Sequence, residues 1–488
     1  MATEDFDELC RAIVNSIANE RTYEALAIAS LSLVHVDTAA YVNRAHRALR
    51  HVPPVHEVAN DIEQFFLQLE GDFNDEATSD LVNWLSAHAG SCPMAILLWL
   101  DGRLLKTSGI VSLPEPFYTG VMAVQIPVEL RVALGFTNNF HEVFICRRFV
   151  ETTKAPIGMQ HTDPGTYLPN WHVIPDTPDL GQGSRKLEVS DASSGVFGAS
   201  CRLLAGRKDI RIYLGEYDAH PVFRSNLIDG DGKQLWHAEG LTNESAVIDE
   251  TLTHLQRAYD NYVDVVVLPE LMLPPTVVEA VSDWLNLNNC SDDGTFRIQW
   301  VVAGSFHHAI DGSKGSVENR ATLLDRVGNN IRALAQGKLT SVDIVVDDSK
   351  VVENNEKATL LKLANTALGI HAVMICLDLG QGAHTDRVPL ERLPLRWLWV
   401  PSLSKTTNAH ADRAKQLCVN HVVTVVCANQ AKADFGGGKM LEGKALDSFV
   451  RENSGSGSGN ILVRCGYEGT TWKILKAKVA HMVNGNRD

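Results

Sequence analysis

Short runs of β-branched and other apolar residues recur through the second half of this sequence, and each ends at a proline, a glycine or a polar residue. They occur at 209–215, 264–270, 299–306, 369–379, 395–401 and 421–429. A run without polar alternation is typical of a strand buried on both faces, as in sheets covered by helices. The sequence therefore predicts an α/β fold with sheets inside and helices outside.

The segments between these runs predict further elements. Apolar residues spaced by steps of four and three predict a helix with one apolar face, formed by Ile248, Leu252, Leu255, Tyr259 and Tyr262. The segment 320–334 predicts two strands joined by a Gly-Asn-Asn turn. The segment 461–479 (ILVRCGYEGTTWKILKAKV) is similar to a β-hairpin.

The first two hundred residues have a different texture. Residues 1–92 predict an α-helical region, and 93–150 a small mixed α/β segment. Residues 151–205 carry five prolines and predict a linker or wrapping loop, so 206–488 is expected to be the main domain. The expected amphipathic helices of the first region span 4–19, 22–35, 57–70 and 78–89.

Charge and composition exclude several classes of function. The 488 residues include 44 Lys+Arg against 59 Asp+Glu, a net charge of −15, which argues against a nucleic-acid partner. No apolar stretch approaches the roughly 18 residues of a membrane span. The acidic N-terminus does not resemble a signal peptide, and nine scattered cysteines form no disulfide framework, so we expect a cytoplasmic protein.

Three reactive side chains lie where predicted strands end. Glu270 ends the 264–270 run, Cys376 follows AVMI, and Lys338 comes just after the predicted 320–334 hairpin. In layered α/β folds such strand ends carry functional groups. A carboxylate can take the thiol proton, the thiolate can attack a carbonyl or nitrile carbon, and an ammonium can stabilise the resulting charge. This chemistry needs neither a metal nor an organic cofactor.

Other assignments of these groups stay open at this point. Lys314 or Lys350 could replace Lys338 if the hairpin is misaligned. His384 and His410 follow the cysteine, so a Cys/His dyad is an alternative, although neither lies in a recognisable local signature.

The motifs around the three residues resemble the nitrilase, or carbon–nitrogen hydrolase, superfamily over about residues 206–485. VVVLPEL is similar to the family's strand ending in Pro-Glu, Gly337-Lys338 to its lysine segment, and MICLDLG to its nucleophile strand. Residues 412–430 are similar to its following helix and strand. The resemblance implies an αββα sandwich, commonly paired into dimers, so a homo-oligomer is expected.

The resemblance also implies roles for individual residues. Glu270 would be the general base, Cys376 the nucleophile and Lys338 the oxyanion stabiliser, with the Leu377 backbone N–H as a second oxyanion donor. A further family carboxylate would correspond to Glu353 or Glu356.

Departures from the family pattern point to an unusual pocket. The usual Lys-x-His-Leu is Lys338-Leu339-Thr340-Ser341 here, and Leu377 replaces a frequent aromatic residue. His307 and Asp378 are candidate pocket residues.

The expected function is hydrolysis of a non-peptide carbon–nitrogen bond, in an amide or nitrile, through a Cys376 thioester. One alternative is a catalytically silent or conditionally activated scaffold that binds a protein partner through its N-terminal helices, since nitrilase-like domains resembling this one also occur in bacterial antiviral systems. A third is transfer of the acyl group to an amine.

Overall fold

The protein, seen in a computed structural model, forms two compact units. One unit holds residues 1–149, 157–178 and 392–394, and the other holds 150–156, 179–391 and 395–488. The structure describes residues 12, 121–125, 142–147, 171–175, 186–228, 232–310, 316–346, 349–380, 390, 393–421, 423–434, 440–442, 447–453, 460–464 and 472–478. Within these ranges, no helix combines the length and the apolar character needed to cross a membrane.

The described part of the first unit is a three-stranded antiparallel sheet in the order β1-β2-β3. Its strands are β1 (Val121–Gln125), β2 (Glu142–Arg147) and β3 (Trp171–Pro175). The helices expected before residue 90 lie outside the described residues, apart from Ala12, which is helical.

The first sheet of the second unit has six strands in the order β11-β10-β9-β8-β5-β22. The three central strands β5, β8 and β9 are parallel, and Val265–Val267 of β8 is fully buried, as expected for a run without polar alternation. The strands are β5 (Asp209–Gly215), β8 (Val265–Val267), β9 (Trp300–Ala309), β10 (Val317–Asp325), β11 (Gln336–Gly337) and β22 (Trp472–Lys478).

The second sheet has seven strands in the order β21-β20-β17-β16-β15-β14-β4. Here β15, β16 and β17 are parallel neighbours, and these three buried strands are among those that the sequence predicts. The strands are β4 (Lys186–Asp191), β14 (Leu360–Thr366), β15 (Gly369–Val373), β16 (Leu395–Leu403), β17 (Thr424–Gln430), β20 (Phe449–Asn453) and β21 (Asn460–Arg464).

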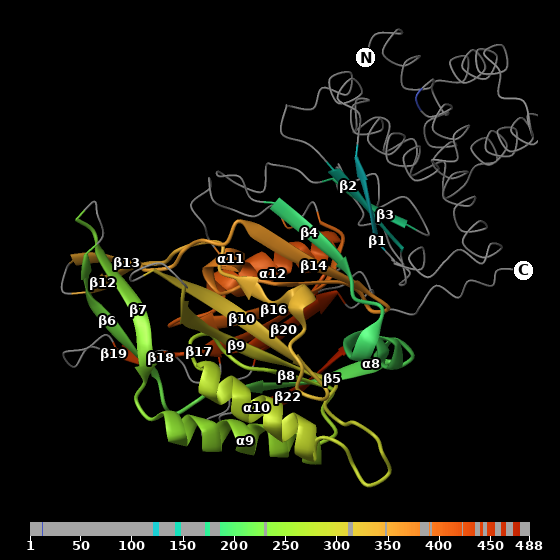
Figure 1. The fold of residues 1–488 in the computed structure, drawn as a ribbon, viewed down its shortest axis with the longest axis horizontal. Helices are drawn as coiled ribbons and strands as arrows, with labels where there is room; N and C mark the ends of the chain where they lie inside the picture. Colours follow the sequence, from blue (N-terminus) through green and yellow to red (C-terminus); the bar gives the residue numbers. More distant parts are fainter. Residues whose placement is uncertain are drawn as a thin grey trace, which may run out of the picture. The chain divides into compact units, whose positions relative to one another are not determined.

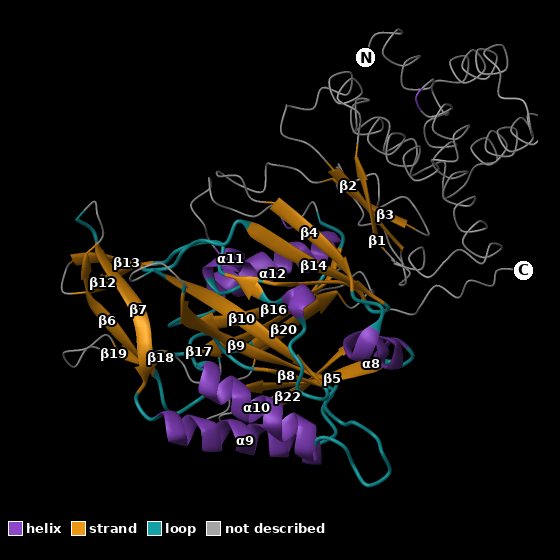
Figure 2. Cartoon of the chain, viewed as in Figure 1, coloured by secondary structure: helices purple, strands orange, loops and turns teal. Residues whose placement is uncertain are grey.

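The two sheets pack face to face between helices (Figures 1 and 2). Trp300 of the first sheet meets Trp399 of the second at a ring separation of 5.9 Å, within an apolar core built from both sheets. Helices α9 (Glu244–Asp260) and α10 (Pro275–Asn288) cover the outer face of the first sheet, and α12 (Asn408–His421) contacts β17 and β20 of the second. The order is therefore helix, sheet, sheet, helix, as the α/β prediction requires.

A third sheet extends from this sandwich, and the sequence analysis did not foresee it. Its strand order is β12-β13-β7-β6-β18-β19, and Figure 1 shows it beside the ends of β9 and β10. It packs on the sandwich through a small apolar cluster that includes Phe306 and Leu271. The strands are β6 (Pro221–Ile228), β7 (Gln234–Leu241), β12 (Asp343–Val346), β13 (Ser349–Glu353), β18 (Lys432–Asp434) and β19 (Met440–Glu442).

The structure differs from the sequence analysis in three segments. The expected linker 151–205 holds β3, the edge strand β4 and helix α8 (Gly195–Ala205), whose Phe197 and Leu204 join the core between the sheets. The expected hairpin at 461–479 is wrong: β21 pairs with β20 and β22 pairs with β5, so the two strands belong to different sheets. In 320–334 the return strand is delayed by a 3-10 helix, η3 (Arg332–Leu334), and begins only at β11.

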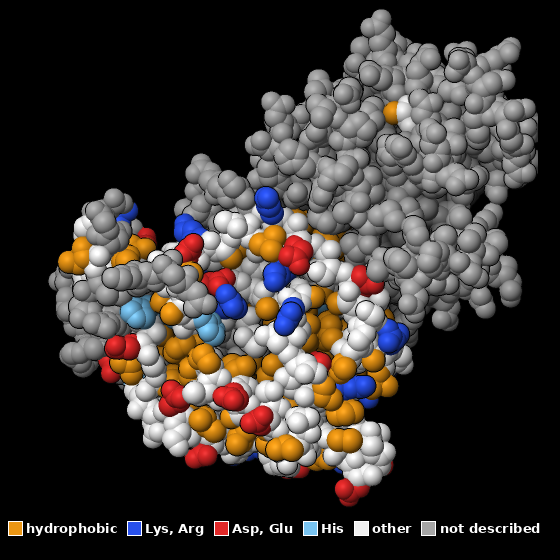
Figure 3. All heavy atoms as spheres, in the orientation of Figure 1, with side chains coloured by type: hydrophobic (Ala, Val, Ile, Leu, Met, Phe, Trp, Pro, Cys, Tyr) orange, Lys and Arg blue, Asp and Glu red, His pale blue; other side chains and the backbone are white. Residues whose placement is uncertain are grey.

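The described surface carries a mixed charge pattern. Lysine and arginine side chains are interspersed with acidic ones over the described part of the face in Figure 3, with apolar side chains between them. The groups that bear on chemistry lie below this surface.

Candidate active site

Glu270 lies just beyond the carboxyl end of β8. Its backbone forms a single parallel bridge with Ser305 of β9, and its N–H donates to the carbonyl oxygen of Ser402 at 3.3 Å. Its side chain is 2% exposed, and its Oε2 accepts the Leu403 N–H at 2.9 Å. Because Ser402 and Leu403 end β16, these contacts join the first sheet to the second at the position of the carboxylate.

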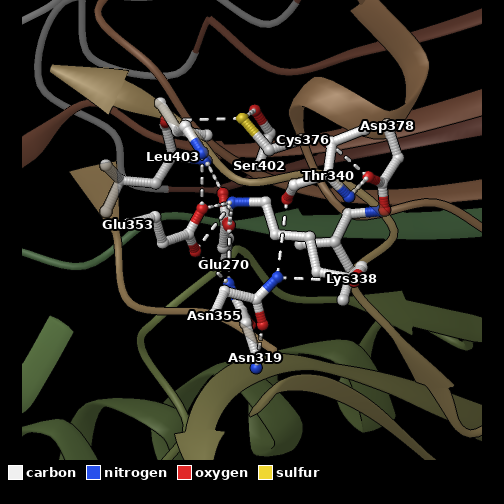
Figure 4. A network of polar contacts seen from close by, with 12 residues as sticks. Glu270, Asn319, Lys338, Thr340, Glu353, Asn355, Cys376, Asp378, Ser402 and Leu403 are labelled. Atoms are coloured by element: carbon white, nitrogen blue, oxygen red, sulfur yellow. Dashed lines mark hydrogen bonds and ion pairs between the residues drawn. The ribbon is translucent and has the colours of Figure 1, made fainter. Parts of the chain in front are cut away.

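Cys376 lies at the end of the segment that begins with β15, immediately before the short helix α11 (Leu377–Gly380). Its φ is 46°, in the left-handed region that non-glycine residues rarely adopt and that often marks a functional position. Its Sγ accepts a hydrogen bond from Ser402 Oγ at 3.4 Å and donates to the Leu403 carbonyl at 3.5 Å. Figure 4 shows the thiol and these partners above the carboxylates.

Lys338 directly follows β11, which pairs with β10. Its N–H donates to the carbonyl of Asn319 at 2.7 Å, which continues this pairing and directs the side chain inward. The ammonium is 1% exposed and lies 2.8 Å from Glu270 Oε1 and 2.8 Å from Glu353 Oε2. The structure thus brings Glu270, Lys338 and Cys376 into one network, as the sequence predicts (Figure 4).

Glu353, and not Glu356, is the further carboxylate of this network. Glu353 ends β13 with a fully buried side chain, and both of its oxygens contact the Lys338 ammonium, at 3.0 and 2.8 Å. Glu356 is exposed. Glu353 is still within β13, whereas Glu356 lies three residues beyond the end of the strand, where the chain has turned to the surface.

Asn319 is a member of the site that the sequence analysis missed. Its Nδ2 donates to Glu270 Oε1 at 3.0 Å and to Glu353 Oε1 at 3.2 Å, so one amide holds both carboxylates. A signal was available: Asn319 lies on the inward face of β10, between the buried Val317 and Ala321. A polar residue among inward apolar ones at a period of two requires a partner inside.

Burial and neighbouring charges set the protonation of the network. Burial raises the pKa of the Cys376 thiol to about 12, and Glu270 adds to this while Lys338 opposes it, so the resting group is a neutral thiol. Burial would lower the pKa of Lys338, but Glu270 and Glu353 outweigh it and hold the amine above its ordinary value. Burial would raise the pKa of Glu353, yet Lys338 and His307 outweigh it and lower the pKa to about 2. An ammonium and an ionised Glu353 therefore face each other.

Asp378 braces the lysine segment. Its carboxylate accepts the N–H of Leu339 at 3.1 Å, and the N–H and hydroxyl of Thr340 at 2.9 and 2.7 Å. Burial raises its pKa to about 6, with the Thr340 hydroxyl the first of the groups that oppose the rise. Asp378 thus ties the helix after Cys376 to the residues after Lys338, and the Thr340 of the unusual lysine motif supplies the hydroxyl.

His307 lies inside the molecule and not at an open strand end. It is 7% exposed, its Nδ1 accepts the Ala238 N–H at 2.8 Å, and its Nε2 lies 3.2 Å from Glu353 Oε1. Its contact with the site runs through Glu353.

The remaining candidates take other places. His410 Nε2 donates to the Cys376 carbonyl at 3.1 Å, which is a backbone contact and not that of a Cys/His dyad. His384 and Lys314 lie outside the described residues, as does the side chain of Lys350. No group of three or more His, Cys, Asp or Glu side chains within the described ranges has the arrangement of a metal site.

No protein-family model and no curated protein matches this chain. Solved structures similar to it include the C. elegans NitFhit protein, with a TM-score of 0.39 and 16% identity, over 56% of this chain and 61% of that chain. Saccharomyces cerevisiae Nit3, a member of branch 10 of the nitrilase superfamily, has a TM-score of 0.36 and 16% identity, over 56% of this chain and 90% of its own. An amidase from Nesterenkonia sp. has a TM-score of 0.36 and 13% identity, over 56% and 91%. The match with NitFhit spans less than two thirds of that protein. Over about half of its own length, this chain is similar to solved structures that include a member of the nitrilase superfamily.

Proposed function

We propose that this protein hydrolyses an amide or nitrile carbon–nitrogen bond through a thioester on Cys376. The observation that carries the proposal is the position of the Leu403 backbone. Its N–H donates to Glu270 Oε2 at 2.9 Å, and its carbonyl accepts from Cys376 Sγ at 3.5 Å. The backbone of one residue thereby contacts both a carboxylate and a protonated thiol, which is the pairing that nucleophilic activation needs.

In the first half-reaction on an amide, Glu270 takes the proton of the Cys376 thiol as the sulfur attacks the carbonyl carbon. A base is required because the resting group is a thiol whose pKa is raised to about 12. The negative charge that develops on the carbonyl oxygen is stabilised by the Lys338 ammonium and the Leu377 N–H. When the carbon–nitrogen bond breaks, Glu270 returns the proton to the leaving nitrogen, and the thioester remains.

In the second half-reaction, Glu270 takes a proton from water, and the hydroxide attacks the thioester carbon. Collapse of this intermediate releases the carboxylic acid and returns the proton to Cys376. The same thioester can instead be attacked by an amine, in which case the product is a new amide and the protein is an acyltransferase.

Glu353 supports the charge of Lys338 throughout this cycle. The ammonium must remain protonated while Glu270 gains and loses a proton, and Glu270 is one of its two carboxylate partners. A second carboxylate that remains ionised keeps a counter-charge beside Lys338 at every step.

Thiol labelling at neutral pH tests the proposal without a substrate. Limiting iodoacetamide is added to the wild type and to Glu270→Gln, and mass spectrometry follows the modification of each cysteine. Cys201 and Cys418 are matched internal controls, because both are buried and burial raises the pKa of each to about 12. We expect Cys376 to react first in the wild type and to lose its lead in the variant. If Cys376 reacts no faster than Cys418, or is indifferent to Glu270→Gln, the proposal is wrong.

A panel of amides and nitriles, assayed for ammonia release with and without an added amine, then separates hydrolysis from acyl transfer. Hydrolysis gives the acid in both conditions, whereas an acyltransferase gives product only when the amine is present.

A further inference from the structure

His307, on β9 of the first sheet, contacts two strands of the third sheet: β7 through Ala238, and β13 through Glu353, the partner of Lys338. On one side its Nδ1 accepts the N–H of Ala238, a residue of β7. A ring nitrogen that accepts a hydrogen bond carries no proton, so the proton of the neutral ring is on Nε2. On the other side this Nε2–H points to Glu353 Oε1 at 3.2 Å. The two contacts fix both the tautomer and the orientation of the ring.

The backbone of the third sheet fixes Glu353 as well. Glu353 pairs in parallel with Trp236 of β7, and the next N–H, that of Asn354, donates to the Trp236 carbonyl at 2.6 Å. The Trp236 ring lies edge-on to the His307 ring at 5.9 Å. The Val342 N–H, just before β12, donates to Glu353 Oε2 at 3.0 Å. Glu353, the last residue of β13, is thus held by β7 and by the residue before β12, in a sheet that contributes none of the three proposed reacting side chains.

We infer that His307 is a positioning residue, which holds Glu353 against Lys338 and thereby links the reactivity of Cys376 to the third sheet. The inference rests on the proposed function, since it supposes that Lys338 acts on charge that develops at Cys376. Without the Nε2–H bond, Glu353 Oε1 keeps Asn319 and Lys338 as its partners among the described residues. The ammonium would then be drawn further toward Glu353 and be less able to stabilise a thiolate.

Two substitutions separate the two contacts of the ring. In His307→Asn, the side-chain oxygen takes the place of Nδ1 and can still accept the Ala238 N–H, but residue 307 no longer offers a donor to Glu353. In His307→Gln, the longer side chain places an N–H donor where Nε2 was, and the acceptor for Ala238 is lost. A purely structural role in anchoring β7 would make Asn the better replacement, whereas positioning of Glu353 would make Gln the better one.

The experiment measures the rate of Cys376 alkylation in the full chain, relative to the exposed Cys290 of the same molecule. We expect His307→Asn to slow the alkylation of Cys376 by about five- to tenfold, as for one lost charge-assisted hydrogen bond. In His307→Gln the alkylation rate should remain within about twofold of the wild type. The Cys290 rate and the thermal midpoint monitor the fold of each variant.

Glu353→Gln completes a double-mutant cycle. If His307 acts through Glu353, adding His307→Asn to Glu353→Gln changes the Cys376 rate no further. The inference is overturned if His307→Asn leaves the alkylation rate of Cys376 unchanged, or if this rate is higher in His307→Asn than in His307→Gln. It is also overturned if the losses of rate caused by His307→Asn and Glu353→Gln simply add in the double variant. Failure of the proposed function is distinguishable, because wild-type Cys376 would then be indifferent to Glu270→Gln before any change at His307.

Discussion

Two cysteines of the same apolar core show how little burial alone says about reactivity. Cys201 on α8 and Cys376 after β15 both contribute to the cluster between the sheets. Burial raises the pKa of both thiols to about 12. Around Cys201 the groups that influence the pKa are the Thr366 side chain and Arg202. Around Cys376 they include Glu270, Lys338 and Ser402.

The difference lies in what can receive the proton. A thiol with a raised pKa is inert unless a base takes its proton as it reacts. Cys376 shares the Leu403 backbone with the Glu270 carboxylate, and its own backbone is in the left-handed region, with a φ of 46°. Cys201 lies within a regular helix. The partners of the two buried thiols, and not their resting pKa values, therefore distinguish Cys376, the proposed nucleophile, from Cys201.

The substitutions Cys376→Ala and Cys201→Ala test this comparison directly, and the first has the largest expected effect. On any amide or nitrile that the wild type converts, Cys376→Ala should lower the rate by about 10³-fold or more, because the proposed thioester forms on Cys376. The rate of Cys201→Ala should remain within about threefold of the wild type. This variant should lose only unfolding free energy, because the substitution leaves a small cavity. Ammonia release and urea unfolding measure the two effects. Equal losses of activity would remove the distinction between the cysteines.

Removal of the ammonium should cost the most stability. Lys338→Ala leaves Glu270 and Glu353 facing each other in the interior, and breaking such a buried pair costs about 3–5 kcal/mol of unfolding free energy. Urea unfolding measures it, with the exposed Lys405→Ala as the matched control, expected to be within about 0.5 kcal/mol of the wild type. Adding Glu353→Gln to Lys338→Ala should recover part of the loss. A fully tolerated Lys338→Ala would contradict the charge pairing.

The pH dependence of stability should isolate Glu353. Its pKa in the folded protein, about 2, lies below the ordinary 4.5, so its stabilisation is complete above about 4.5 and is lost as the pH falls toward 2. The unfolding free energy of the wild type minus that of Glu353→Gln should therefore shrink over this window, by roughly 2–3 kcal/mol. For Glu356→Gln, at an exposed position, the same difference in unfolding free energy should not change with pH. A pH-dependent difference for Glu356→Gln, or a pH-independent one for Glu353→Gln, would count against the assignment.

The smallest effect is expected at Ser402. Its hydroxyl donates to Cys376 Sγ at 3.4 Å, and such a donor favours the thiolate. Ser402→Ala should slow alkylation of Cys376 by about two- to tenfold, the range expected for one hydrogen bond, and should leave Cys201 unchanged. Mass spectrometry of both sites gives the result. A slowing common to both cysteines would indicate a general change of structure and not a local one.

Much of the sandwich could be predicted from local sequence. The strand expected at 209–215 is β5 with the same bounds. Of the expected face of α9, Leu255 is buried and Ile248, Leu252 and Tyr259 are half-buried, but the inclusion of Tyr262 is wrong, because it lies beyond the end of the helix and is exposed. Strands without polar alternation can only be buried, and reactive side chains in layered α/β folds lie at the carboxyl ends of such strands, so Glu270 and Cys376 could be predicted as candidates. Their meeting could not be predicted in this way, because their strands belong to two different sheets. The three reactive residues are local consequences of where apolar runs stop.

The rest depended on pairing between distant segments. The third sheet joins strands from 221–241, 343–353 and 432–442, and no local period specifies which edge receives them. The choice of Glu353 over Glu356 follows from the register of β13 in this sheet. The contacts of Glu270 with Asn319 and with the Leu403 backbone likewise join segments that lie far apart in the sequence. Hydrophobicity and strand period are local properties, so the order of residues is enough to predict which of them are buried and which could react. Which buried polar groups meet depends on the folded chain, because a charge without a partner is excluded from the interior and the partner here is distant in the sequence.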